Sequence, residues 1–190
     1  MEIRQATISS LAVYGEISIA FTVYSVFDIV PVRNGLEGLG LVERKLDAPY
    51  DKDYDLERNN KPNHWLKRFD TRYWVVFFAY DKNDRVGGVT IAWKTPELTL
   101  IPYRKETALI WDLRVKPEMR FLGLGRKLVA AAKEWAMSKG CDEIIVETQN
   151  INVPACRFYA SQGFELFSIN PLAYPELPSE TQLLWRLKIN

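Results

Sequence analysis

The sequence predicts a mixed α/β fold of the α+β type, with helices flanking a central, mostly antiparallel sheet that contains one parallel pair of strands. Residues 73–93 form two β-rich runs joined by the turn DKND, which is typical of an antiparallel hairpin. Residues 126–139 have the apolar period of an amphipathic helix. This helix connects predicted strands at 107–115 and 141–147, and a helical crossover between neighbouring strands makes them parallel.

The sequence signals for strands and helices are weaker before residue 73. Residues 17–32 are rich in β-branched and aromatic side chains, which favours a strand that Pro31 limits. Residues 47–65 are polar and turn-rich, which indicates a solvated loop or the start of a helix. The alternative is that this segment forms the rim of a binding site and attracts a cationic substrate. It carries five acidic residues, Asp47, Asp51, Asp53, Asp55 and Glu57.

The second half of the chain alternates helices and strands. Gly140 is a helix stop of the usual kind for the helix at 126–139. A second, shorter helix begins near Asn152 and Pro154, which are capping and first-turn residues, and it ends before Gly163. Two closing strands complete the pattern: 164–169 and 182–188.

Length and composition place limits on the class of protein. The 190 residues fit a single domain, 1–190. A formal net charge of +1 does not favour binding to nucleic acid or to an anionic membrane. The two cysteines are too few for a disulfide framework and indicate a reducing compartment. The N-terminus lacks the pattern of a signal peptide, and no apolar run approaches the roughly 20 residues of a membrane span. We therefore expect a soluble, cytoplasmic protein.

We first interpret several reactive or aromatic side chains as ordinary structural residues. Cys141 and Cys156 are expected to pack in the core, since no histidine or charge cluster accompanies them. His64 is the one histidine, lies in a polar segment and is expected at the surface. One histidine and two cysteines provide too few ligands, so the sequence predicts no metal site. Trp111 and Tyr174 are candidates either for the core or for the wall of a substrate pocket.

A glycine-containing turn precedes the helix at 126–139. The segment RFLGLG, residues 120–125, follows a predicted strand, so its backbone N–H groups and the helix N-terminus converge on one place. Glycine removes the Cβ that would hold a phosphate away from the main chain, and Arg120, Arg126 and Lys127 add positive charge. The turn is therefore a candidate phosphate cradle, although glycines before a helix also serve simply as tight-turn residues.

A second motif stands downstream, in the segment ETQNINVPACRFYASQGF at 147–164. Together with RFLGLG it resembles the GNAT superfamily of N-acetyltransferases over roughly residues 70–170. Within that superfamily, the segments DAPYDKDYD, ALIWDLRV, EWA, AYP and LLWRLK are similar to the streptothricin acetyltransferase branch. The resemblance implies a single GNAT domain, with acetyl-CoA as co-substrate and no metal.

The resemblance also assigns residues to the cofactor. The turn is expected to hold the pyrophosphate of acetyl-CoA, and the strand before it is expected to pair through its backbone with the pantetheine arm. A backbone N–H of Leu113 or Val115 is expected to polarise the thioester carbonyl. The cofactor-binding residues so implied are Leu113, Arg114, Val115, Arg120, Phe121, Leu122, Gly123, Leu124, Gly125, Arg126 and Asn152.

Acetyl transfer to an amine needs a base and an acid. An alkylamine has a free pKa of about 10.4, so a proton must be removed before its nitrogen attacks the thioester. Glu147 and Asp112 are the two candidate bases, acting directly or through water, and either carboxylate is also able to bind the ammonium group. The resemblance implies that Tyr159 protonates the departing thiolate; its alternative role is packing in the core.

The function expected from these motifs is transfer of acetyl from acetyl-CoA to a primary amine of a small cationic acceptor such as streptothricin. One alternative acceptor is a protein N-terminus or lysine, and another is a polyamine. A further alternative is a non-catalytic acyl-CoA-binding module, against which the presence of Tyr159 argues, because a binder needs no acid. A homodimer is an arrangement that the resemblance allows.

Overall fold

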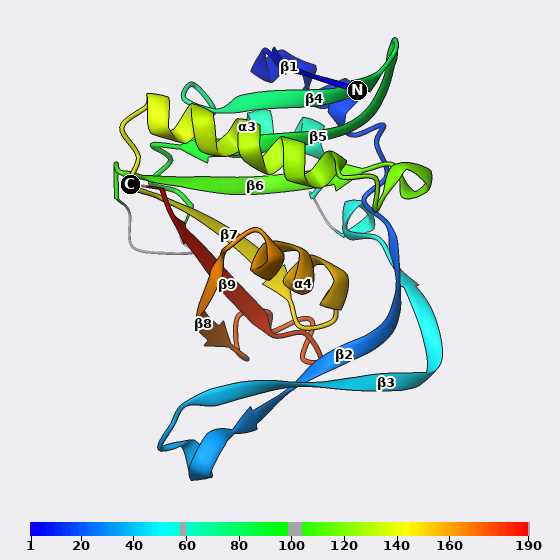
Figure 1. Ribbon diagram of the computed structural model, residues 1–190, viewed down its shortest axis with the longest axis vertical. Helices are drawn as coiled ribbons and strands as arrows, with labels where there is room; N and C mark the ends of the chain where they lie inside the picture. Colours follow the sequence, from blue (N-terminus) through cyan, green and yellow to red (C-terminus); the bar gives the residue numbers. More distant parts are fainter. Residues whose placement is uncertain (58–59, 99–103, 190) are drawn as a thin grey trace. The chain divides into compact units, whose positions relative to one another are not determined.

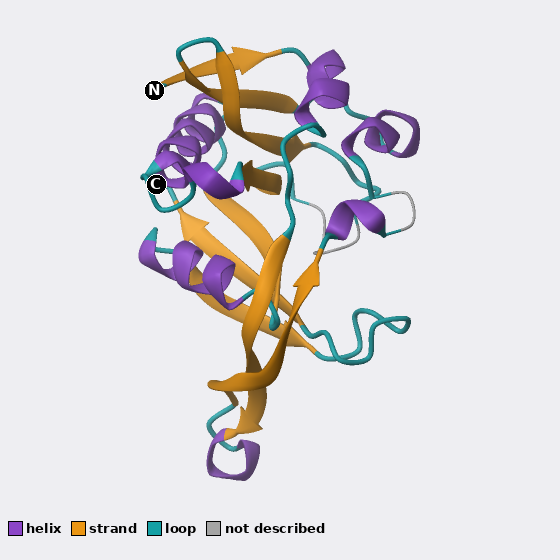
Figure 2. Ribbon diagram, turned by 90° about the vertical axis from the view of Figure 1, so that its right-hand side faces the viewer, coloured by secondary structure: helices purple, strands orange, loops and turns teal. Residues whose placement is uncertain are grey.

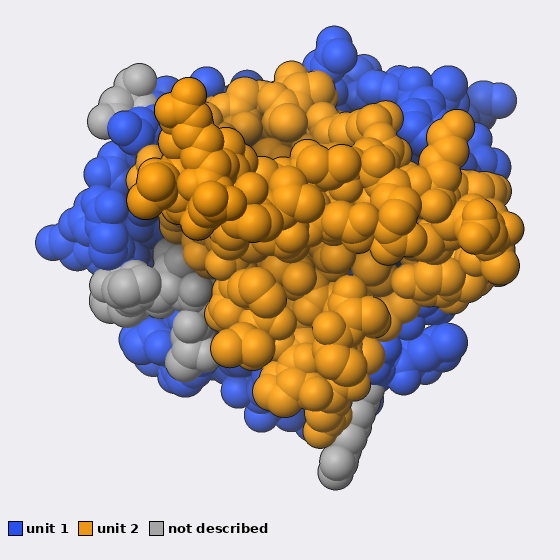
Figure 3. Space-filling view, turned by 90° about the horizontal axis from the view of Figure 1, so that it is seen from below, with its two compact units in different colours: residues 1–21, 53–145, 188–190 blue, residues 22–52, 146–187 orange. Residues whose placement is uncertain are grey.

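The computed structural model describes residues 1–57, 60–98 and 104–189. The chain divides into two compact units (Figure 3). Unit 1 comprises residues 1–21, 53–145 and 188–190, and unit 2 comprises residues 22–52 and 146–187.

Seven strands form one sheet in the order β1-β4-β5-β6-β7-β9-β8, and β2 and β3 form a separate two-stranded sheet. The sheet is mostly antiparallel, and β6 and β7 are its parallel pair, as the helical crossover between them predicts. The strands are β1 Glu2–Ala6, β2 Phe21–Pro31, β3 Leu39–Lys52, β4 Val75–Asp81, β5 Asp84–Trp93, β6 Thr107–Val115, β7 Glu143–Gln149, β8 Glu165–Asn170 and β9 Gln182–Lys188.

Helices cover both faces of the sheet in unit 1 (Figure 1 and Figure 2). Helix α3, Leu124–Ser138, lies on one face, and α1, Leu11–Tyr14, with α2, Pro62–Arg68, lies on the other. Two adjacent glycines of β5 show this alternation, because strand side chains point to opposite faces. A Cβ at Gly87 would lie 3.5 Å from Leu128 of α3, whereas a Cβ at Gly88 would lie 2.6 Å from Tyr14 of α1.

Aromatic side chains dominate the core beneath α1 and α2. Trp65 and Trp74 are buried, with ring centroids 6.5 Å apart. Trp111 of β6 packs edge-on against Trp65 at 6.1 Å and against Phe69 at 5.2 Å. Trp111 therefore contributes to the core of unit 1.

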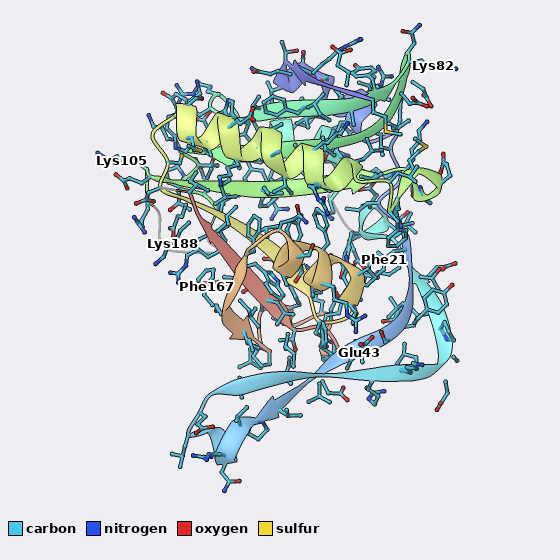
Figure 4. All side chains as sticks on the ribbon, viewed as in Figure 1. Phe21, Glu43, Lys82, Lys105, Phe167 and Lys188 are labelled. Carbon is cyan, nitrogen blue, oxygen red and sulfur yellow. The ribbon has the colours of Figure 1, made fainter. Side chains whose placement is uncertain are left out.

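Unit 2 contains the long β2–β3 hairpin and helix α4, Val153–Ser161. The hairpin is joined to the rest of the unit by Asn150, whose backbone carbonyl accepts from Phe27 N–H at 2.9 Å. Glu43 of β3, labelled in Figure 4, forms an ion pair with Arg157 of α4. These contacts tie the exposed hairpin to the helix that carries Tyr159.

The strands and helices predicted from residue 73 onward are confirmed, with ends shifted by about two residues for α3 and β7. The interpretation of residues 47–65 as a loop or helix start was wrong for its first part, because β3 continues to Lys52. Strand β3 exposes most of its side chains, so its sequence has no apolar alternation to indicate a strand. The short elements β1 and α1 were not predicted.

Within the described ranges, no helix combines the length and the apolar character needed to cross a membrane. The same residues contain no group of three or more His, Cys, Asp or Glu side chains able to hold a metal ion.

Candidate active site

The glycine turn, residues 120–126, connects β6 to α3 in unit 1. Gly123 is the N-cap of α3 with φ of +81° and ψ of 4°, a left-handed conformation that favours glycine. No side chain caps the helix, and the first backbone N–H that bonds back to the N-cap residue is that of Lys127, to Gly123 O at 3.3 Å. A Cβ at Gly123 would meet no heavy atom within 4 Å. The helix N-terminus therefore faces open space with N–H groups suited to an anion.

The residues before Gly123 are unusually exposed. Phe121 has a φ of +63° and a side chain that is 98% exposed, and Leu122 is 58% exposed. A left-handed conformation costs a non-glycine residue roughly 1–2 kcal/mol, and an exposed ring gains little packing to offset it. The turn must therefore be held in shape by contacts elsewhere.

Arg120 supplies those contacts. Its Nε donates to Val115 O at 3.0 Å and its Nη2 donates to Ala20 O at 2.8 Å. Partial burial lowers the pKa of Arg120 from its ordinary value. The sequence predicts a phosphate-binding role for this guanidinium. In the structure its hydrogen bonds to two backbone carbonyls hold the turn in place. Arg126 and Lys127 are exposed on the first turn of α3.

The backbone of β6 alternates between N–H groups that face β5 and N–H groups that point to its opposite side. Lys116 N donates to Val86 O of β5 at 2.9 Å. Because hydrogen-bonded residues alternate along an antiparallel ladder, Arg114 bonds to β5 in the same way. The intervening residues Leu113 and Val115 turn their N–H groups away from β5. These are the two residues whose N–H groups the sequence predicts to serve the acyl donor.

Asp112, the other candidate base, is paired with neighbouring side chains. Its side chain is 7% exposed and its two oxygens accept from Arg114, at 2.9 Å from Nε and 2.7 Å from Nη2. Tyr14 also donates its hydroxyl to Asp112 Oδ1 at 2.5 Å. The carboxylate is therefore one partner of a guanidinium whose side chain is completely buried.

Glu147 occupies a different environment, in the part of β7 that belongs to unit 2. Burial raises the pKa of its carboxyl, and three hydrogen-bond donors act in the opposite direction by stabilising the ionised form. The donors are Tyr174 Oη at 2.6 Å from Oε1, Gln149 Nε2 at 3.2 Å from Oε1 and Gln182 Nε2 at 2.7 Å from Oε2. The arrangement is a partly buried carboxylate held by neutral groups, which suits proton acceptance or ammonium binding.

The donors around Glu147 were largely missed from the sequence. Tyr174 was a candidate for the pocket wall, and burial raises the pKa of its hydroxyl, with the charge of Glu147 adding to the effect. Gln149 lies within the 147–164 segment and Gln182 begins the predicted strand at 182–188, but neither was given a role in the site. The one available signal was that Gln149 follows Glu147 by two residues on a strand, which places both side chains on one face.

Helix α4 positions the remaining predicted residues. Asn152 is its N-cap, and Asn152 Oδ1 accepts from Ala155 N at 3.2 Å, so this side chain has a local structural role. Tyr159 is 6% exposed, and its ring packs at 5.1 Å from Phe158 and 5.3 Å from Phe164. Packing on two sides fixes the ring, which leaves the position of its hydroxyl well defined.

Comparison with known proteins decides the family. The acetyltransferase (GNAT) family model matches residues 41–164. The chain belongs to this family, in its streptothricin acetyltransferase branch. Streptothricin acetyltransferase A of Bacillus subtilis (strain 168) is 35% identical over 150 residues, which span 77% of this chain and 78% of that protein. Streptothricin acetyltransferase of Escherichia coli is 28% identical over 170 residues, or 87% of this chain and 83% of that protein.

A solved structure supports the fold. A protein of Bacillus anthracis str. Ames, in complex with acetyl coenzyme A, has a TM-score of 0.76 and 24% identity, with 98% of each chain covered. This likeness shows that the chain has the GNAT fold, and the family match makes it an N-acetyltransferase. The resemblance noted from RFLGLG and the 147–164 segment is thereby confirmed.

The two cysteines and the histidine of this acetyltransferase are not among the candidate catalytic or cofactor-binding residues. Cys156 is 1% exposed and contacts Thr148 Oγ1 at 3.2 Å, and burial raises the pKa of its thiol to about 11. Burial also raises the pKa of the Cys141 thiol to about 11. His64 is half-buried in α2 rather than fully at the surface, and its Nδ1 is buried with no hydrogen-bond partner among the residues described.

Both cysteines are expected to resist alkylation in the folded protein. A thiol pKa of about 11 leaves roughly 10²-fold less thiolate than a free cysteine has at pH 8, and burial further excludes the reagent. Mass spectrometry after iodoacetamide treatment measures the modified fraction, with protein unfolded in guanidinium as the control. Rapid native modification would contradict the packing role.

Proposed function

We propose that this acetyltransferase moves the acetyl group of acetyl-CoA to a primary amine of a small cationic acceptor of the streptothricin type. The observation that carries the acceptor class is the 35% identity, over most of both chains, to a protein named for that activity. The environment of Glu147 supports it, because a partly buried carboxylate held by neutral donors suits an ammonium group.

The donor half of the reaction is assigned to unit 1. The helix N-terminus at Gly123 takes the pyrophosphate, where open space and the helix dipole favour an anion. The N–H groups of Leu113 and Val115, turned away from β5, pair with the pantetheine arm and polarise the thioester carbonyl. The side chain of Arg114 takes no direct part, because it is fully buried.

The proton transfers are assigned to unit 2. Glu147 accepts a proton from the substrate ammonium, directly or through water, and the neutral nitrogen attacks the thioester carbon. The C–S bond then breaks, and Tyr159 gives its proton to the departing thiolate. The acetylated nitrogen releases its surplus proton, which restores the Tyr159 hydroxyl, so that Glu147 keeps the one proton lost overall. We prefer Glu147 to Asp112 as the base, because Asp112 is already paired with a buried guanidinium.

Replacing Glu147 with Gln is expected to lower kcat/KM on the order of 10²-fold and to remove the acid limb of its pH profile. The base must be ionised, and burial raises the pKa of Glu147, so wild-type activity falls as pH decreases through that raised pKa. Tyr174→Phe removes a hydrogen bond that lowers this pKa, and it should move the limb to higher pH. Initial rates measured across the pH range test both statements. An unchanged acid limb in the Glu147→Gln variant would exclude Glu147 as the base.

The acceptor is identified by a turnover screen with acetyl-CoA. Release of coenzyme A thiol is followed with streptothricin, aminoglycosides, polyamines and a ribosomal N-terminal peptide, each compared with a reaction lacking the amine. We expect streptothricin to give the highest kcat/KM. A higher value for the peptide or for a polyamine would replace the proposed acceptor and keep the acetyl-CoA chemistry, and turnover of none would contradict both.

A further inference from the structure

Arg114 carries a guanidinium that is completely enclosed within unit 1, with 0% side-chain exposure. A guanidinium has five N–H groups, and five hydrogen bonds occupy them. Three acceptor groups share these bonds: Asp112 at 2.9 Å from Nε and 2.7 Å from Nη2, Asp55 at 2.8 Å from Nη1 and 3.2 Å from Nη2, and Ile17 O at 3.0 Å from Nη1. We name these four residues the Arg114 cluster.

Tyr14 packs against the Arg114 cluster, and Gly88 leaves space for the Tyr14 ring. The ring of Tyr14 lies 4.9 Å from the guanidinium carbon, and its hydroxyl bonds to Asp112 Oδ1 at 2.5 Å. Gly88 of β5 makes room for this ring, since a Cβ there would come within 2.6 Å of it. A buried ion pair is stable only when its hydrogen bonds are complete, and this one meets that condition.

The cluster joins segments that are far apart in the sequence. Ile17 lies just before β2, where the chain leaves unit 1, and Asp55 lies just after β3, where the chain returns. Arg120 of the glycine turn holds the same outgoing segment through Ala20 O. Residues 17–20 are thus bound at one end by an arginine of β6 and at the other by an arginine of the turn.

We propose that Arg114 is a positioning residue for acetyl transfer: it fixes β6 and the glycine turn against residues 17–20 and 53–56, so that acetyl-CoA binding at the turn also orders these two segments. The proposal rests on the proposed function in one respect, which is that the turn holds the cofactor. Arg114 acts through Asp55 and Ile17 and touches neither the cofactor nor the acceptor.

Hydrogen exchange with and without acetyl-CoA tests this coupling in wild type, in Asp55→Asn and in a matched control, Glu143→Gln. Asp55→Asn keeps the shape of the side chain and removes its charge. The control makes the same carboxylate-to-amide change at the other end of unit 1's sheet, where Glu143 bonds Arg104 and Thr107. Arg114→Lys, which keeps the buried charge but loses the planar fork, is the second variant if Asp55→Asn does not fold.

In wild type and in the control, acetyl-CoA should slow exchange at the turn and also at residues 17–20 and 53–56. In Asp55→Asn the turn should still be protected, the two segments should not, and kcat should fall about tenfold with acetyl-CoA affinity retained. A lower melting temperature with unchanged kcat and unchanged segment protection would show a purely structural role and overturn the inference.

Wild-type exchange separates the inference from the proposed function. Protection of residues 120–126 without protection of the two segments would overturn the coupling alone. Absence of any protection at residues 120–126 would overturn the proposed cofactor site and the coupling with it.

Discussion

Tyr159→Phe should lower kcat about 10³-fold while leaving the affinity for acetyl-CoA within threefold of wild type. The substitution removes one oxygen from a ring that Phe158 and Phe164 already hold in place, so packing is preserved. In the proposed mechanism, what is lost is the proton that Tyr159 gives to the departing thiolate. Steady-state rates give kcat, and calorimetry with acetyl-CoA gives the affinity.

A second acyl donor sharpens this test. A thioester whose thiol is a stronger acid needs less help to leave, so the Tyr159→Phe variant should recover much of its rate with such a donor. Tyr80→Phe on β4, outside the proposed machinery, is the matched control and should show neither effect. An equal defect with both donors would show that Tyr159 is not the acid.

Gly123→Asp should weaken acetyl-CoA binding about 10³-fold, because like charges brought together cost several kcal/mol and each 1.4 kcal/mol is tenfold in affinity. The new carboxylate would project into the open space in front of the α3 N-terminus, where the pyrophosphate is proposed to lie. The left-handed φ adds strain at the same position. Calorimetric titration with acetyl-CoA measures the loss.

Gly140→Asp separates charge in the phosphate site from backbone strain. Gly140 also has a positive φ, of +75°, and a Cβ added to it would likewise meet no heavy atom within 4 Å, but it lies at the other end of α3. This variant should lose stability and keep its affinity for acetyl-CoA. Equal weakening in both variants would mean that strain in α3, and not occupation of the turn, is responsible.

Local signals allowed much of the fold to be predicted. The helix α3 and the turn before it follow from neighbouring residues, because apolar periodicity and glycine conformation are properties of a short segment. The family motif placed Tyr159 on α4, and the strand β6 was predicted with its observed ends. Such elements need no knowledge of distant residues.

The partners of the charged residues were not predictable in the same way. Asp55 meets Arg114 across 59 positions, and Tyr14 meets Asp112 across 98. Glu147 lies on β7, but the strand continues to Gln149 and does not end at Glu147 as predicted. The donors to Glu147, Tyr174 and Gln182, lie 27 and 35 positions away. A sequence pattern records which residues are charged, whereas burial and pairing arise only when the chain has folded.

The division of unit 1 into separate stretches of chain affects how the protein is made. Strand β1 pairs with β4, with Glu2 opposite Tyr80, and Ile189 N near the end of the chain donates to Asp142 O at 2.9 Å. Pairings of such high contact order form slowly, because the intervening chain must first be confined. Apolar residues of the first helix, including Leu11, therefore remain uncovered during synthesis until β4 to β6 have emerged from the ribosome. We expect the nascent chain to depend on chaperones over that interval.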